Sequence, residues 1–248
     1  MILKRLAVGV RNQDWFIVVL EVLIVVVGIF LGLQVDAWNE ARKERNTEQE
    51  VLVALQKDLV ASVASLDNAI ANKNVIQSRL LELAALAPKD IAVIDEKALD
   101  TLIVEGLFES GIHFIQNDIY ANLKAAGKLS LIQSDMLQQQ LIKIGQWSED
   151  SRSIEVDYST MQFQNIDPHL LANYPLRRGS HLDDRSAELP PPTDAAAFDY
   201  QAFIFSTKTQ NFIFTKFYLG NGSLADLSTL REGFLEAIRL IGLELKST

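Results

Sequence analysis

The side chains that most often carry chemistry are scarce in this sequence. It contains no cysteine and only three histidines. We expect His113 to be a half-buried packing residue, and His169 and His181 to lie in loops. The absence of cysteine excludes disulfide scaffolds, thiolate metal sites and cysteine nucleophiles. Asp183 and Asp184 follow His181 and could bind a cation weakly, but they lie in a stretch with the composition of a solvated loop. We therefore expect no metal site and no cofactor.

The common catalytic and phosphate-binding motifs are also missing. Gly127 and Lys128 resemble the end of a phosphate-binding loop, but position 122 is Asn where that motif needs a glycine. Leu129 stands where the motif needs Ser or Thr. The sequence has no GxSxG, HExxH, EF-hand or GxGxxG pattern. Because no nucleophile, base and oxyanion donor come together, we expect no catalytic residues and a protein that is not an enzyme.

Charge and composition limit the remaining classes of protein. The chain has 23 basic and 32 acidic residues and a net charge of −9. A nucleic-acid binder usually carries a basic stripe, so no nucleic-acid partner is expected. With 12 glycines and 6 prolines in 248 residues, few positions force a turn. Long helices are favoured.

A membrane anchor is indicated near the N-terminus. Trp15–Leu33 holds fifteen Phe, Ile, Val or Leu residues and one charge, Glu21. Together the fifteen favour insertion by about 4 to 9 kcal/mol. One mid-bilayer carboxylate opposes it by roughly 3 kcal/mol. Trp15 and Trp38 flank the run, about 35 Å apart on a helix, and are the expected membrane-interface anchors.

The alternative is a cleavable signal peptide. Lys4, Arg5 and Arg11 could form its basic region, and residues 35–37 could be cut. Its apolar region would usually span only 7–15 residues and carry no acid, so an uncleaved anchor is favoured. Three basic residues flank each end of the span, which leaves the positive-inside count tied. We expect a cytoplasmic N-terminus and a periplasmic C-terminal domain, because short cationic N-terminal tails are usually retained.

One face of the anchor combines an acid with small residues. Gly28 and Gly32 form a GxxxG motif, which allows two helices to approach closely. At 100° per residue, Glu21 lies about 20° from each glycine. This face predicts association with a second copy or with another membrane protein. Alternatively, the glycines are ordinary for a membrane helix and Glu21 simply reaches the headgroups.

The rest of the chain predicts an all-α fold. No glycine or proline lies between Gly32 and Pro88, and apolar residues recur there at spacings of three and four from Leu52 to Ile70. Similar patterns predict helices at about 96–109, up to Gly127, from Ser134 or Asp135 to about Asn165, over 198–217, and from Ser223. We expect Pro168 and Pro175 to close the stretch that runs to about Asn165, and Gly220–Gly222 to separate the last two. The expected architecture is a transmembrane helix that continues into a long helix, followed by an antiparallel amphipathic bundle.

The expected organisation has four parts, with one irregular segment inside the last. They are a short cytoplasmic tail (1–14), a transmembrane anchor (15–37), a long amphipathic helix (38–88) and the remaining helices (89–248), with a surface loop at about 177–194.

Two motifs resemble a bacterial family known as domain of unknown function 6090. The run from Glu21 to Arg42 is similar to the family's E-[hydrophobic]-GI-[hydrophobic]-LQ-x-x-x-WNE-x-R pattern. Gly127-Lys-Leu-Ser-Leu-Ile, followed by Asp135-Met-Leu, resembles its GKL-x-LI-x-x-D-x-L signature. Ala37 and Ala41 depart from it, since bulkier polar residues are common there. The resemblance implies an uncharacterised single-pass membrane protein with a helical domain in the bacterial inner membrane, and it brings no activity.

Two functions remain open. The favoured one is a non-enzymatic scaffold or accessory subunit in the lipid bilayer that associates through its anchor and helical domain. The alternative is a periplasmic ligand-binding or sensor-like helical module that passes signals laterally to a partner membrane protein.

Overall fold

The computed structural model describes residues 15–114, 119–182 and 198–246, and every regular element within these ranges is a helix. The predicted all-α fold class is confirmed. The chain divides into two compact units, Met1–Leu52 and Val53–Thr248. The predicted cytoplasmic tail, residues 1–14, lies outside the described residues.

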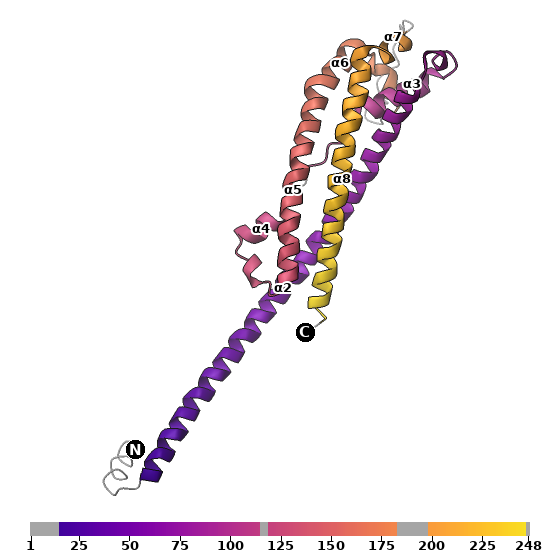
Figure 1. Cartoon of the computed structure of the whole chain (residues 1–248). Helices are drawn as coiled ribbons and strands as arrows, with labels where there is room; N and C mark the ends of the chain where they lie inside the picture. Colours follow the sequence, from indigo (N-terminus) through magenta and orange to yellow (C-terminus); the bar gives the residue numbers. More distant parts are fainter. Residues whose placement is uncertain (1–14, 115–118, 183–197, 247–248) are drawn as a thin grey trace. The chain divides into compact units, whose positions relative to one another are not determined.

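The described part of the first unit is the N-terminal portion of one long helix, α2 (Trp15–Ala85), drawn in indigo and purple in Figure 1. The sequence offers no glycine or proline after Gly32 to interrupt its backbone hydrogen bonds. Most large apolar side chains of residues 15–35 are exposed, from 44% for Leu20 to 79% for Phe16. By length and composition, α2 is the one helix in the described chain that could cross a membrane.

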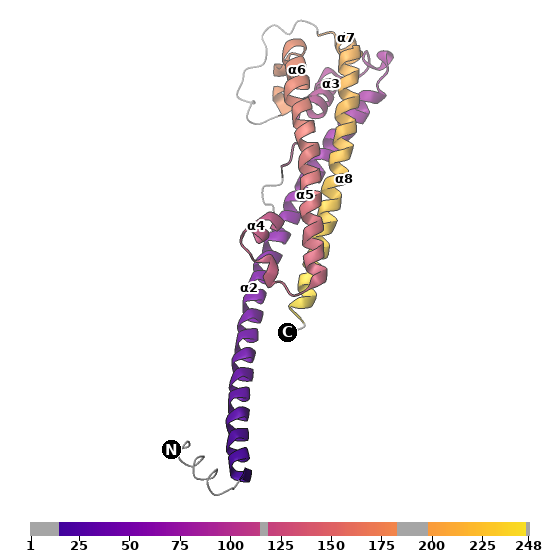
Figure 2. The ribbon, with the colours of Figure 1, turned by 60° about the vertical axis from the view of Figure 1, so that its left-hand side comes forward.

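The second unit is built around three long helices that lie side by side in Figures 1 and 2. They are residues 53–85 of α2, α5 (Asp135–Met161) and α8 (Thr207–Glu244).

The direction of α8 is opposite to that of both long neighbours. Trp147 of α5 lies against Gly233 of α8, whereas Ile154, seven residues later, lies against the earlier Gly222. Figures 1 and 2 show that α8 also runs against the second half of α2. The predicted antiparallel packing therefore describes α8, while the second half of α2 and α5 run in the same direction. This arrangement arises because the chain returns along the bundle before α5 begins.

Short helical elements connect the end of α2 to the start of α5. α2 ends three residues before Pro88, whose ring cannot continue a helix. Gly111 and Gly127 adopt φ values of +58° and +66°, which favour glycine and end the helical segments before them. The elements are η1 (Pro88–Asp90), α3 (Glu96–Ile103), η2 (Val104–Phe108), α4 (Ile119–Ala125) and η3 (Leu129–Leu131).

The prediction that Pro168 closes the α5 helix is wrong. α5 passes into a π-helix, η4 (Gln162–Ile166), and then into α6 (Asp167–Asn173). Pro168 is the second residue of α6 and directly follows the π-helical turn, in which the Asp167 N–H donates to the Gln162 oxygen, five residues earlier. The helical path ends at Tyr174, next to Pro175, and η5 (Leu176–Leu182) follows. The predicted surface loop thus begins as a 3₁₀ helix, and its residues 183–194 lie outside the described residues.

The predicted break at Gly220–Gly222 is also wrong. The helical interpretation of 198–217 holds, as α7 (Tyr200–Ile204) and the start of α8, but the break falls at Ser206, whose side chain caps α8. From there α8 continues without interruption. Gly220 lies inside α8 at a point where α2 packs so closely that a Cβ would lie 1.8 Å from Gln77 Nε2.

An apolar core lies at the end of the second unit where α3, α6 and α7 come together (Figures 1 and 2). Phenylalanines of residues 198–217 contribute to this core: Phe203 is buried in it, and Phe198, Phe212 and Phe217 pack against it. Phe214 is an exception, with 71% of its surface exposed.

Candidate functional site

The three residues predicted to mediate association, Glu21, Gly28 and Gly32, all lie in the uninterrupted first part of α2. Helical periodicity therefore places them on one face. No described atom approaches within 4 Å of the position that a Cβ would take on either glycine. Glu21 Oε2 is shielded from solvent and has no hydrogen-bond partner among the described residues. The face is accessible to a second helix, and association through it stays a prediction.

The two predicted interface anchors lie in the same helix. Trp15 is the first residue of α2, and both Trp15 and Trp38 expose more than 60% of their surface. The guanidinium of Arg42 lies 5.9 Å from the Trp38 ring centroid. An indole next to a cation suits the boundary between apolar lipid and headgroups.

The middle of the second unit has a polar interior that the sequence did not reveal. The buried stripe of α5 changes from Leu137, Leu141 and Ile144 to Ser148, Ser151, Glu155 and Tyr158, and Gln162 of η4 continues it. The spacing of three and four is unchanged, so the same face still points inward. We use the term polar core for seven of the buried polar residues of the three long helices and η4: Lys73, Gln77, Glu155, Tyr158, Gln162, Lys216 and Ser223.

A buried ion pair lies at the centre of the polar core. Lys73 Nζ of α2 and Glu155 Oε1 of α5 are 2.9 Å apart, and neither side chain is exposed. The Ser223 hydroxyl donates to Glu155 Oε1, and the backbone N–H of His113 donates to Oε2 at 3.0 Å. The Lys73 ammonium also lies 4.2 Å from the ring centroid of Tyr158. Burial lowers the pKa of Lys73, and the charge of Glu155 opposes that shift.

A second buried lysine, Lys216 of α8, binds backbone carbonyl groups at the end of η2 and just after it. Lys216 Nζ donates to the carbonyl oxygens of Leu107 and Glu109, each at 2.7 Å. Gln162 Nε2 donates to the same Leu107 oxygen at 3.0 Å. Burial lowers the pKa of Lys216 to about 7, which Asp167 and Glu109 partly oppose. Residues 107–113 are therefore held to the bundle by the polar core.

Several polar atoms inside the bundle lack a partner among the described residues. They are Gln77 Oε1, Ser151 Oγ, Tyr158 Oη and Gln162 Oε1. Burial and the Glu155 charge raise the pKa of the Tyr158 hydroxyl, which therefore keeps its proton. A buried polar group without a partner destabilises the fold by about 1–3 kcal/mol. The interior of the bundle thus holds polar atoms whose hydrogen bonds are not supplied by the described residues.

The two histidines that the structure describes are packing residues. His113 is half-buried as expected, and burial lowers its pKa. The prediction that His169 lies in a loop is wrong, because it is buried in α6, 3.1 Å from Thr209 Oγ1. Its ring stacks on Phe203, and burial lowers its pKa. No group of three or more His, Asp or Glu suited to a metal occurs in residues 15–114, 119–182 and 198–246.

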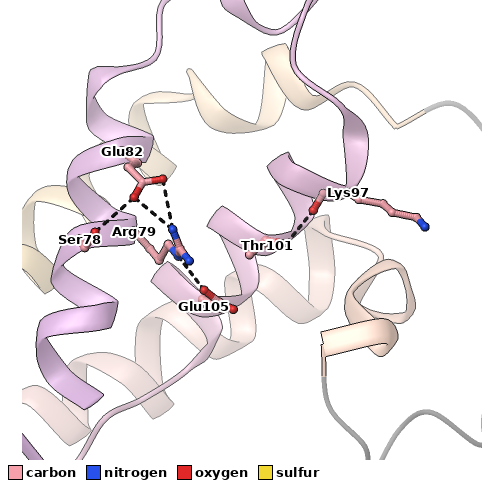
Figure 3. Close-up of polar contacts among 6 residues, drawn as sticks. All are labelled: Ser78, Arg79, Glu82, Lys97, Thr101 and Glu105. Carbon is pink, nitrogen blue, oxygen red and sulfur yellow. Dashed lines mark hydrogen bonds and ion pairs between the residues drawn. The ribbon is translucent and has the colours of Figure 1, made fainter. Parts of the chain in front are cut away.

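An open groove lies where the end of α2 meets α3. Its volume is about 560 Å³, within the range of small-molecule sites. Figure 3 shows Arg79 of α2 between Glu82 of the same helix and Glu105 of η2. The shortest nitrogen–oxygen distances are 3.1 and 2.7 Å. Arg79 and Glu82 line the groove together with Ala85, Leu86, Ile94, Ala98, Thr101 and Leu102. Glu105 contacts Arg79 and is not itself one of the lining residues.

Comparison with protein-family models, curated proteins and solved structures found no match. The geometry alone therefore defines the class: an all-α protein in which one helix of the described residues could span a membrane by length and composition.

Sequence reasoning missed the polar core because lysine, serine and glutamate predict solvent exposure in most helices. A signal was nevertheless present. Lys73 continues the apolar spacing that passes through Leu66 and Ile70, and Glu155 continues the spacing from Leu137. Polar residues that replace apolar ones in phase with a stripe indicate buried polar layers, but they do not say which residues pair.

Proposed function

We propose that the chain is a non-enzymatic single-pass membrane protein that acts as a scaffold or accessory subunit of a membrane-associated assembly. One observation carries the proposal: residues 15–35 form a continuous helix whose large apolar side chains are mostly exposed. A soluble monomer rarely exposes more than a few hundred Å² of contiguous apolar surface. Lipid or another membrane helix would cover this surface.

The proposed location is the bacterial inner membrane, with the N-terminus in the cytoplasm and the helical domain in the periplasm. The short cationic N-terminal tail supports this orientation. Membership of domain of unknown function family 6090 is also a proposal, supported by the motif from Glu21 to Arg42 and by the Gly127 motif.

Membrane insertion is tested by extraction and by topology reporters. We expect the full chain to remain in the membrane pellet after alkaline carbonate treatment. A C-terminal alkaline phosphatase fusion should be active, whereas a C-terminal fluorescent reporter that folds only in the cytoplasm should be dark. Release by carbonate would contradict the anchor, and the opposite reporter pattern would contradict the orientation alone.

Association through the anchor is tested by cross-linking in mild detergent. The Gly28→Leu/Gly32→Leu variant fills the small-residue face, and we expect it to lose the cross-linked species. Phe30→Leu is the matched control, because Phe30 lies about 160° from either glycine on the helix. If the double variant and the control assemble equally, the Glu21, Gly28 and Gly32 face has no part in association.

A second candidate function is a ligand-binding or sensor-like module that signals laterally to a partner membrane protein. Two observations favour it: the groove between α2 and α3, and the unpartnered polar atoms next to Lys73, which belongs to the same helix as the apolar segment. A ligand that binds only the folded chain must raise its melting temperature. A thermal-shift screen on the full chain in nanodiscs, with Ala85→Leu as the groove-filled control, tests this candidate.

A further inference from the structure

The groove between α2 and α3 combines an apolar wall with a charged end. Small side chains create the hollow, since Ala85 comes from α2 and Ala98 from α3. Leu86, Ile94 and Leu102 supply larger apolar surface around them. Such a wall favours an alkyl or aromatic group of matching length, because burying apolar surface drives binding.

The charged end is held in place by tight packing. Gly106 allows η2 to lie against α2, because a Cβ there would be only 3.3 Å from Arg79 Cβ. This approach brings Glu105 within 2.7 Å of Arg79 Nε, while Glu82 contacts Nη1 of the same guanidinium. The Ser78 hydroxyl donates to Glu82 as well.

The sign of the charge at this end is negative. One guanidinium faces two carboxylates, so the Arg79, Glu82 and Glu105 cluster carries a net charge of −1. Figure 3 shows that the Lys97 side chain points away from the cluster. The Glu82 and Glu105 side chains are 49% and 31% exposed, so their oxygens remain reachable.

We propose that this groove binds a cationic amphiphile, a molecule with an ammonium group and a short alkyl or aromatic body. The body lies along Ala85, Ala98 and Leu102, and the ammonium lies near Glu82, next to the pair that Arg79 forms with Glu105. Arg79 holds the two carboxylates in place and its own charge is neutralised, so an anionic head group meets net repulsion. The inference rests on the second candidate function and names its ligand class, and it is independent of the scaffold proposal.

The test compares three probes with the same tail: octylamine, octan-1-ol and octanoate. Each is titrated by calorimetry into the full chain in phosphatidylcholine nanodiscs, and empty nanodiscs provide the blank for partition into lipid. We expect saturable binding of octylamine, about fivefold tighter than that of octan-1-ol, the size of effect expected for a partly exposed ion pair. Octanoate should bind more weakly than either.

Three variants locate the site. Ala85→Leu fills the groove and should weaken octylamine binding by about tenfold, because an overfilled site must deform to admit a ligand. Ala84→Leu adds the same side chain to the neighbouring exposed position, outside the groove, and should change nothing. Glu82→Gln should remove the preference for octylamine over octan-1-ol and leave octan-1-ol binding unchanged.

Each other outcome overturns the proposal in a distinct way. A preference for octanoate would show that Arg79 dominates, which rejects the cationic class and leaves a ligand site in the groove. Equal binding to Ala85→Leu and Ala84→Leu would place the probes outside the groove. No saturable binding of any probe would reject this ligand class, and a negative thermal-shift screen would be needed to reject the sensor function itself.

Discussion

The buried ion pair between Lys73 and Glu155 makes a quantitative prediction about stability. Removing one partner of a buried pair destabilises a protein by about 3–5 kcal/mol, because the other charge is left without compensation. Lys73→Met leaves Glu155 two donors, the Ser223 hydroxyl and the His113 N–H. We therefore expect Lys73→Met to lower the unfolding free energy by about 3 kcal/mol, the lower end of this range. Glu155→Gln leaves Lys73 with an amide oxygen and the Tyr158 ring, and we expect a similar or larger loss.

A double variant measures the interaction energy between Lys73 and Glu155 apart from their contacts with other residues. Lys73→Met/Glu155→Gln contains no buried charge at this point, so its loss of stability should be smaller than the sum of the single losses by about 2 kcal/mol. The assay is urea unfolding of the full chain in dodecyl maltoside, followed by circular dichroism at 222 nm. Arg231→Met is the control, because it breaks an exposed pair with Asp67 between α2 and α8 and should change stability far less.

The result that refutes this reasoning is additivity. If the double variant loses as much as the two single variants together, Lys73 and Glu155 do not interact in the folded protein. Single losses as small as that of Arg231→Met would mean that water reaches both charges.

Three further predictions concern α8, α6 and the second buried lysine. Gly233→Ala should destabilise by about 1–3 kcal/mol, because its Cβ would lie 2.6 Å from the Trp147 ring, whereas Gly242→Ala should be neutral or stabilising, with nothing within 4 Å. Between pH 7 and 10 the folded state holds fewer protons on Lys216 than the unfolded state, so the unfolding free energy should rise with pH, and Lys216→Met should reduce this slope. Because burial lowers the pKa of His169, stability should fall as the pH drops below about 6.5, and His169→Asn should weaken that dependence.

Urea unfolding at a series of pH values checks all three. Equal stability of the two glycine variants would show that the Trp147 ring moves aside freely. An unchanged slope above pH 7 in Lys216→Met would mean that this lysine stays charged when folded, through its two carbonyl contacts. An acid dependence that survives intact in His169→Asn would assign it to other groups, of which His113 is the first to test, because burial lowers its pKa too.

The sequence by itself determined the helical nature of this protein and its apolar segment. α2 and α3 follow from local causes: an apolar spacing of three and four, few glycines, and Pro88 after the long helix. The positions of Glu21, Gly28 and Gly32 on one face follow from helical geometry alone. These features depend on residues within a few turns of one another, so a linear sequence contains all the information that they need.

Only the tertiary structure decided what the helices surround. In the sequence Gly220 suggests a helix break, yet it lies inside α8, where Gln77, more than 140 residues earlier, occupies the space that a side chain would fill. By residue type, Lys73 and Glu155 are expected on the surface. They are buried because each compensates the charge of the other, although 82 positions separate them in the sequence. A buried charge is tolerated only beside a partner. Which distant residue supplies that partner depends on the direction and register of whole helices, and local patterns do not contain that information.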